Sequence, residues 1–240
     1  MAVDKKGKTT KARNKTPASM GSLMVFFKYP EPGFVKTRLA KEIGETEATR
    51  AYRTLLNYTL DNVSNVQGAK VVLLYDAPKR SRPKGFETPK TWRHLRQSDG
   101  DIGNRFRNAF EHVLQNDPGK AIVIGVDCVG LTPEIMTESF LRLDETDIVL
   151  GPSEDGGYYL IGMKDPNLAM GLFRDIPWST DKVFSATLEK AWTMGLKVHV
   201  LPRLFDVDTA KDWLRAQKED MSISELVSSL GHDGGGPKDA

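Results

Sequence analysis

Acidic side chains stand directly after two apolar segments of the chain. Asp127 follows the most strand-like run in the sequence, and Asp206 and Asp208 follow a second strand-like segment near the end. A carboxylate at the end of a buried strand is desolvated unless it is paired or bound to a cation. Hard divalent metals bind such oxygens and keep water or phosphate as further ligands. The alternative is that these acids cap turns or helices, since Thr209-x-x-Asp212 has the pattern of a helix-start capping box.

A turn that carries two cations follows the first apolar run. Residues 29–38 read Tyr-Pro-Glu-Pro-Gly-Phe-Val-Lys-Thr-Arg, and a long helix is expected to begin at about Lys36. Cations are unfavourable at a helix N-terminus alone, so Lys36 and Arg38 suggest an anion between them, such as a phosphate chain. The alternative is a proline turn followed by solvated bases. The segment is not a Walker loop, because Val35 stands where the second glycine belongs. Two acids at strand ends and a cationic turn together describe a metal–nucleotide site.

The elements that must position these residues alternate along the chain. Apolar runs predict strands, and apolar residues at helical spacing predict helices. Strands that are apolar on both faces and alternate with helices predict a mostly parallel, Rossmann-like sheet in a three-layer α/β/α sandwich. Ligands of such sheets bind beyond the carboxyl ends of the strands. The expected strands are 23–28, 70–75, 121–126, 148–150, 158–161 and 197–201, and the expected helices are 39–63, 102–113, 133–143, 181–194 and a segment from Thr209 onward.

Composition excludes several classes of protein. The 240 residues are 39% hydrophobic, enough for a substantial core, and no apolar run approaches the length of a membrane span. The one cysteine, Cys128, excludes an intrachain disulfide framework, and its neighbour Asp127 raises its pKa, which disfavours a nucleophile. Ser153 misses the hydrolase elbow pattern by one residue.

The charge is unevenly placed along the chain. Residues 1–22 hold six bases and one acid, which leaves 28 bases and 31 acids in the remaining body. A mildly acidic body argues against nucleic acid as a partner. We expect residues 1–22 to be a disordered basic extension, 23–230 to be a single domain and 231–240 to be a flexible tail. The start lacks the apolar region of a secretory signal, and we expect a cytoplasmic protein.

Six ordered motifs resemble a known family. They are Phe-Lys-Tyr-Pro-Glu-Pro-Gly-Phe-Val-Lys-Thr-Arg-Leu-Ala (27–40), Gly-Asp-Ile-Gly-Asn-Arg-Phe (100–106), Gly-Val-Asp-Cys-Val-Gly-Leu-Thr-Pro (125–133), Gly-Pro-Ser-Glu-Asp-Gly-Gly-Tyr-Tyr-Leu (151–160), Ile-Pro-Trp-Ser-Thr-Asp (176–181) and Phe-Asp-Val-Asp-Thr (205–209). Over about residues 23–215 the chain resembles bacterial GT-A-like nucleotide-diphospho-sugar transferases, sometimes called arsenosugar-biosynthesis glycosyltransferases. The resemblance implies an α/β/α sandwich like that of phospholactate guanylyltransferase and the molybdenum-cofactor nucleotidyltransferases. Val129 departs from the family, which usually has proline there.

The resemblance also implies roles for particular residues. Lys36 and Arg38 match the phosphate-contacting turn, with Gly33 allowing close approach. Asp127 matches the metal-binding acid, and Asp208 resembles the second acid of a magnesium site. The base and ribose would meet Gln97 and Asp101. The acceptor side would comprise a catalytic Asp155, which orients or deprotonates the acceptor hydroxyl, with Glu154, Gly156, Gly157, Trp178 and Ser179. A tight hairpin turn and a partly buried tryptophan are the structural alternatives for this last group.

Three functions are consistent with these features. The first is a transferase dependent on Mg²⁺ or Mn²⁺ that uses a nucleotide-diphospho-sugar and a small-molecule acceptor. The second is a nucleotidyltransferase that transfers NMP from an NTP to a phosphorylated acceptor and releases pyrophosphate. The third is a catalytically silent nucleotide-binding protein. If Asp127 and Asp208 share a metal, they repel each other without it, so replacing either acid is expected to leave the ligand-free protein as stable or slightly more stable. The base, the sugar, the acceptor and the oligomeric state stay open.

Overall fold

The computed structural model describes residues 19–78 and 88–230. The expected tails lie outside these residues, apart from residues 19–22. The first strand, β1 (Gly21–Lys28), begins two residues before the expected start, because it pairs with β2 (Ala69–Asp76) from Gly21 onward. In the described part of the chain, no helix is both long and apolar enough to cross a membrane.

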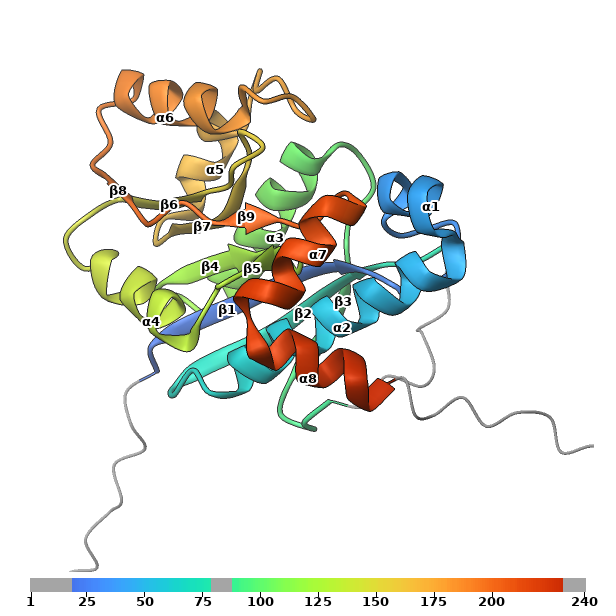
Figure 1. The fold of residues 1–240 in the computed structure, drawn as a ribbon. Helices are drawn as coiled ribbons and strands as arrows, with labels where there is room; N and C mark the ends of the chain where they lie inside the picture. Colours follow the sequence, from blue (N-terminus) through green and yellow to red (C-terminus); the bar gives the residue numbers. More distant parts are fainter. Residues whose placement is uncertain (1–18, 79–87, 231–240) are drawn as a thin grey trace, which may run out of the picture.

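Within the described residues, seven strands form one sheet in the order β3-β2-β1-β4-β7-β6-β8 (Figure 1). β7 runs antiparallel to β4 and β6, and the other neighbouring pairs are parallel. The mostly parallel sheet expected from the apolar runs is therefore confirmed. The remaining strands of this sheet are β3 (Arg93–Arg96), β4 (Ala121–Ile124), β6 (Ile148–Pro152), β7 (Tyr158–Met163) and β8 (Val198–Val200).

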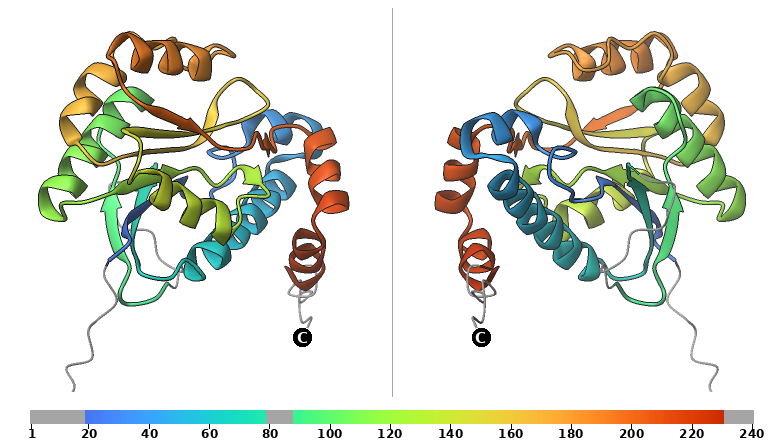
Figure 2. Two further views of the ribbon diagram at one scale, coloured as in Figure 1. Left: turned by 90° about the vertical axis from the view of Figure 1, so that its left-hand side faces the viewer. Right: turned by 90° about the vertical axis from the view of Figure 1, so that its right-hand side faces the viewer.

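Helices cover both faces of the sheet (Figures 1 and 2). Side chains of α2 (Glu45–Ser64) and α4 (Pro133–Arg142) pack on one face, and those of α3 (Ile102–Asn116), α5 (Pro166–Leu172) and α6 (Val183–Thr193) pack on the other. The alternation along β1 explains both layers, since Val25 joins the first core and Phe26 the second. The three-layer α/β/α sandwich is thus confirmed.

The expected helix 39–63 is two helices. α1 (Thr37–Ile43) and α2 are separated by Gly44, whose φ of 87° and ψ of 156° lie outside the helical region. Glycine adopts a positive φ at little cost, so it ends α1 and lets α2 begin in a new direction. The structure also contains β3 and α5, which the apolar pattern did not predict.

A second, two-stranded sheet joins distant parts of the chain. β5 (Cys128–Val129) pairs antiparallel with β9 (Phe205–Asp206), and the amide of Val207 donates to the carbonyl of Asp127 at 3.0 Å. The C-terminal helices α7 (Ala210–Glu219) and α8 (Met221–Leu230) follow β9, and α8 packs against α2. This small sheet brings Asp208 next to the segment that follows β4.

Candidate functional site

A cavity of about 380 Å³ lies beyond the carboxyl ends of β1 and β4. Its polar lining includes residues from the turn after β1, the segment after β4 and the segment after β9. Its apolar lining includes Phe26 and Phe106, whose rings lie 5.0 Å apart, and the neighbouring Tyr158. The cavity occupies the edge at which α/β sheets bind ligands.

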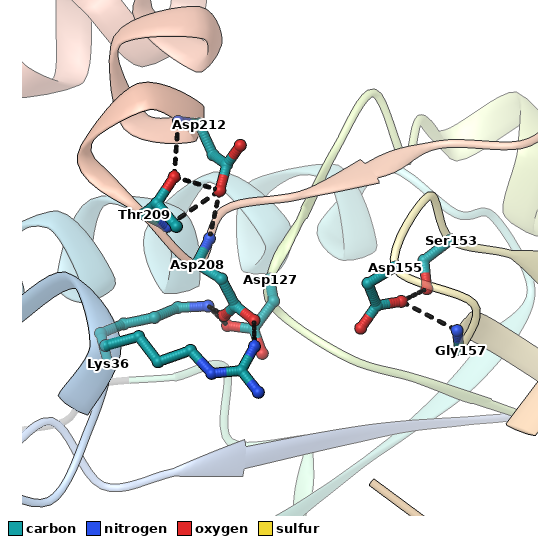
Figure 3. Close-up of polar contacts among 9 residues, drawn as sticks. Lys36, Asp127, Ser153, Asp155, Gly157, Asp208, Thr209 and Asp212 are labelled. Carbon is teal, nitrogen blue, oxygen red and sulfur yellow. Dashed lines mark hydrogen bonds and ion pairs between the residues drawn. The ribbon is translucent and has the colours of Figure 1, made fainter. Parts of the chain in front are cut away.

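Lys36 forms ion pairs with Asp127 and Asp208, the two acids that the sequence suggested as metal ligands. Its Nζ lies 2.7 Å from Oδ1 of Asp127 and 3.2 Å from Oδ1 of Asp208 (Figure 3). Only 4% of the Lys36 side chain is exposed. Its backbone is left-handed, with φ 46° and ψ 47°, which costs about 1–2 kcal/mol in a residue other than glycine. Such a conformation persists where the surroundings fix it, and the two ion pairs do so here.

The charge of Lys36 is preserved in spite of its burial. Burial lowers the pKa of the ammonium, but attraction to Asp127 and Asp208, with their hydrogen bonds, raises it more, so the net shift of the pKa is upward. Arg38 adds a second cation, because its Nη1 lies 3.1 Å from Oδ2 of Asp208 and 73% of its side chain is exposed. Asp208 therefore receives a buried cation on one oxygen and an exposed cation on the other.

Neither Asp127 nor Asp208 caps a helix. Thr132 caps α4 by accepting from the amide of Ile135, and Thr209 caps α7 in a capping box with Asp212. The capping box suggested by the sequence is thus confirmed, and Thr209 rather than Asp208 caps α7.

Asp208 also belongs to a group of three acids. One carboxylate oxygen from each of Asp155, Asp206 and Asp208 lies within 4.8 Å of the others. Oδ1 of Asp155 accepts from the hydroxyl of Ser153 and, at 2.8 Å, from the amide of Gly157, which orients the carboxylate (Figure 3). The sequence suggested Asp155 as catalytic and left Asp206 as a structural alternative, whereas the structure brings both next to Asp208.

The fold changes the pKa of Asp206. Burial, and then the charges of Asp155 and Asp208, raise the pKa of Asp206 from 3.8 to about 6. Between these values the folded chain binds more protons at this site than the unfolded chain, so the free energy of unfolding falls as pH rises through the window.

We expect Asp206→Asn to remove this contribution. In chelator-treated protein, the melting temperature of the parent should fall more steeply from about pH 4 to pH 6 than that of the variant. At pH 7 the variant should melt higher, because the ionised carboxylate beside two others is gone. Thermal melts over this pH series measure both effects, and parallel curves would contradict the expectation.

Among the residues assigned to the nucleotide, Gln97 lines the cavity and Asp101 and Gly33 do not. The side-chain amide of Gln97 donates to the backbone carbonyl of Leu74 at 2.9 Å, so the sheet fixes the orientation of this side chain. Asp101 caps α3 by accepting from the amide of Asn104 at 2.7 Å. Gly33, with a φ of 76°, lies beside Glu45 in the turn. The structure thus places Asp101 and Gly33 outside the lining of this cavity.

The residues assigned to the acceptor lie in several places. Glu154 forms a bidentate ion pair with Arg215 at 2.8 and 3.2 Å, outside the cavity. Trp178 packs edge-on against Phe106 and Tyr158, as the partly buried alternative predicts. Gly156 and Gly157 form the turn that carries Asp155, and the exposed Ser179 has a φ of 63°. A side chain at Gly156 would meet the carbonyl of Asp181 at 2.0 Å, so glycine is needed there for packing.

Arg105 is a cavity residue that sequence reasoning missed. Its Nη1 donates to Asp76 at 2.9 Å and to Oε1 of Gln97 at 3.1 Å, and its Nε donates to the carbonyl of Gly100. The motif at 100–106 contains this arginine, and its place one turn after the start of α3 was the signal available.

Known structures share this fold. A chain described as a "putative nucleotide-diphospho-sugar transferase" from Desulfovibrio desulfuricans G20 has a TM-score of 0.73 and 26% identity, covering 87% of this chain and 98% of that one. The inositol-1-phosphate CTP transferase from T. maritima has a TM-score of 0.52 and 14% identity, covering 91% and 99%. Rv0371C from Mycobacterium tuberculosis H37Rv, solved in complex with manganese, has a TM-score of 0.52 and 16% identity, covering 83% and 98%.

A search of curated protein sequences finds no match to this chain. Residues 59–180 match the profile of a bacterial protein family, and this span is just over half of the chain. It contains the strand β4, the Asp127 segment and the turn that carries Asp155. With the nucleotide-diphospho-sugar transferase fold and the site at its strand ends, the chain belongs to the family described as "Uncharacterized protein conserved in bacteria (DUF2064)".

Proposed function

We propose that this protein is a metal-dependent transferase that uses a nucleotide-diphospho-sugar as donor. The observation that carries the proposal is the convergence of Lys36, Arg38, Asp127 and Asp208 at one end of a cavity with an apolar remainder. Cations suit the diphosphate, carboxylates suit a metal, and an aromatic wall suits a base. The likeness to the Desulfovibrio chain, at 26% identity over 87% of this chain, supports the same class of reaction.

The acids present fit a divalent cation. The site contains two cations, Lys36 and Arg38, and four acids, Asp127, Asp155, Asp206 and Asp208. When all four acids are ionised, the site carries a surplus of two negative charges. Oxygen donors of this kind suit Mg²⁺ or Mn²⁺ rather than a soft metal. We propose that Asp127 and Asp208 hold the ion. When bound, it would supply positive charge to the departing diphosphate.

Lys36 and Arg38 would bind the diphosphate of the donor. Arg38 is exposed and can turn from Asp208 to a phosphate without burying a new charge. Lys36 lines the cavity with a long side chain whose ammonium can exchange a carboxylate for a phosphate oxygen. Both cations would stabilise the negative charge that develops on the leaving group.

Asp155 would act on the acceptor. Ser153 and Gly157 hold its Oδ1, which leaves Oδ2 available to accept a proton from an acceptor hydroxyl. A carboxylate held in one orientation is suited to act as a general base. Its position beside Asp208 would put the acceptor next to the phosphate end of the cavity.

The apolar end of the cavity would take the base. Phe26, Phe106 and Tyr158 offer an aromatic lining, and Gln97 with Arg105 adds polar groups beside it. A small-molecule acceptor and a nucleotide are thus the partners that we propose.

The released product tests the proposal. We expect incubation with a panel of nucleotide-sugars, Mg²⁺ or Mn²⁺ and a mixture of hydroxylated small molecules to release free nucleoside diphosphate, measured by chromatography. The same panel with chelator should release none. Pyrophosphate from an NTP panel with phosphorylated acceptors would instead identify a nucleotidyltransferase. Nucleotide binding without metal and without either product would identify a silent binding protein.

A further inference from the structure

Lys36 already occupies the position of a cation between the proposed metal ligands. Its Nζ contacts Oδ1 of both Asp127 and Asp208, and Oδ1 of Asp127 is buried. A divalent ion that took these same oxygens would place a second positive charge against the ammonium. Metal and Lys36 therefore compete for the two carboxylates.

Lys36 cannot simply leave without a new partner. Its side chain is 4% exposed, and a buried ammonium that loses its counterions carries a large desolvation penalty. Among the described residues, Asp127 and Asp208 are the acids in ion-pair distance of Nζ. The compensating anion must therefore come with the ligand, and Lys36 lines the cavity that would receive its phosphates.

We infer that Lys36 makes metal binding depend on the donor, because the diphosphate draws its ammonium away from Asp127 and Asp208 and frees them for the ion. This inference rests on the proposed function. Metal alone binds weakly to the ligand-free protein, and metal and nucleoside diphosphate bind cooperatively. By thermodynamic linkage, each raises the affinity for the other by the same factor.

The first test measures the binding of Mn²⁺ alone to the full chain. The electron paramagnetic resonance signal of unbound Mn²⁺ reports how much of the ion stays free. Lys36→Met removes the ammonium but keeps the length of the side chain, so it should bind Mn²⁺ at least about tenfold tighter than the parent. The matched control is Lys41→Met, which changes an exposed lysine of α1, the helix that begins directly after Lys36; this variant should bind Mn²⁺ as the parent does. Equal affinities of the parent and Lys36→Met would overturn the inference.

The second test needs no variant and covers the case in which Lys36→Met does not fold. Calorimetry measures Mn²⁺ binding to the parent with and without UDP, GDP, CDP or ADP, corrected for the complex of ion and nucleotide. We expect at least one diphosphate to raise the affinity for Mn²⁺ by tenfold or more. If Mn²⁺ binds equally well with and without every diphosphate, the coupling is wrong while the metal site stands. If it binds in neither case, the metal-dependent function and this inference both fall.

Discussion

Replacing Asp208 by asparagine is expected to reduce turnover by roughly a thousandfold, which corresponds to about 4 kcal/mol of lost transition-state stabilisation. Asp208 contacts Lys36 and Arg38 and also belongs to the group with Asp155 and Asp206. It is the residue on which the proposed metal and phosphate parts of the site meet. Asparagine keeps an oxygen but removes the charge that both parts require.

The same variant should be less stable without ligand, by about 1–2 kcal/mol. The sequence alone suggested the opposite sign, because two carboxylates without a metal repel each other. The ion pairs seen in the structure lead us to expect the opposite, because the buried ammonium of Lys36 already attracts both carboxylates. Losing one of its two partners leaves a buried ammonium less well paired.

Two controls separate these effects in thermal melts and product assays. Thr209→Ala removes the cap of α7 and should lower stability by about 1 kcal/mol while turnover is retained. Asp61→Asn removes an exposed acid on α2 and should change neither. An Asp208→Asn protein with parental turnover would remove this residue from the active site.

Reversing the charge of Arg38 is expected to weaken nucleoside diphosphate binding by about a hundredfold, or near 3 kcal/mol. Arg38→Glu loses a charge-assisted hydrogen bond to phosphate and adds a like charge beside the ligand. Stability should change little, because the side chain is 73% exposed and surface ion pairs contribute little.

Calorimetry at two salt concentrations tests this expectation. The affinity lost in Arg38→Glu should be larger at low salt, where charges are less screened. Lys41→Glu reverses an exposed charge on the same helix and controls for the general field of the protein. Unchanged affinity in a folded Arg38→Glu protein would place the phosphates elsewhere.

The apolar runs were sufficient to predict the sheet, because strands buried on both faces must be apolar throughout. A strand that lacks an apolar run escapes prediction for the same reason. β3 carries two arginines and a histidine in four residues, and its place is decided by pairing with β2. The break between α1 and α2 depends on one glycine inside a pattern that reads as continuous.

Positions after the strands suggested that Lys36, Asp127 and either Asp206 or Asp208 belong to one site, and the family resemblance selected Asp208. Neither could predict how these residues contact one another. Residue type alone assigns lysine to phosphate and aspartate to metal. Tertiary structure is needed to see that Lys36 pairs with both aspartates. Similarly, the resemblance assigned Asp101 and Trp178 to ligands but could not predict that Asp101 caps α3 or that Trp178 packs in an aromatic cluster.

The pairing of β5 with β9 separates the stability of the site from that of the protein. Asp127 and Asp208 are 81 positions apart, and the small sheet that joins them has two residues in each strand. Opening this sheet also exposes Val129, Phe205 and Val207, but the core to which they belong is smaller than the two cores of the central sheet, so we expect the opening to require less free energy than global unfolding. The backbone amide of Val207 is hydrogen-bonded to the carbonyl of Asp127, so its exchange with solvent would report this opening. We therefore expect the chain to be able to lose its site while its central core stays folded, so that catalytic competence follows a local equilibrium as well as global stability.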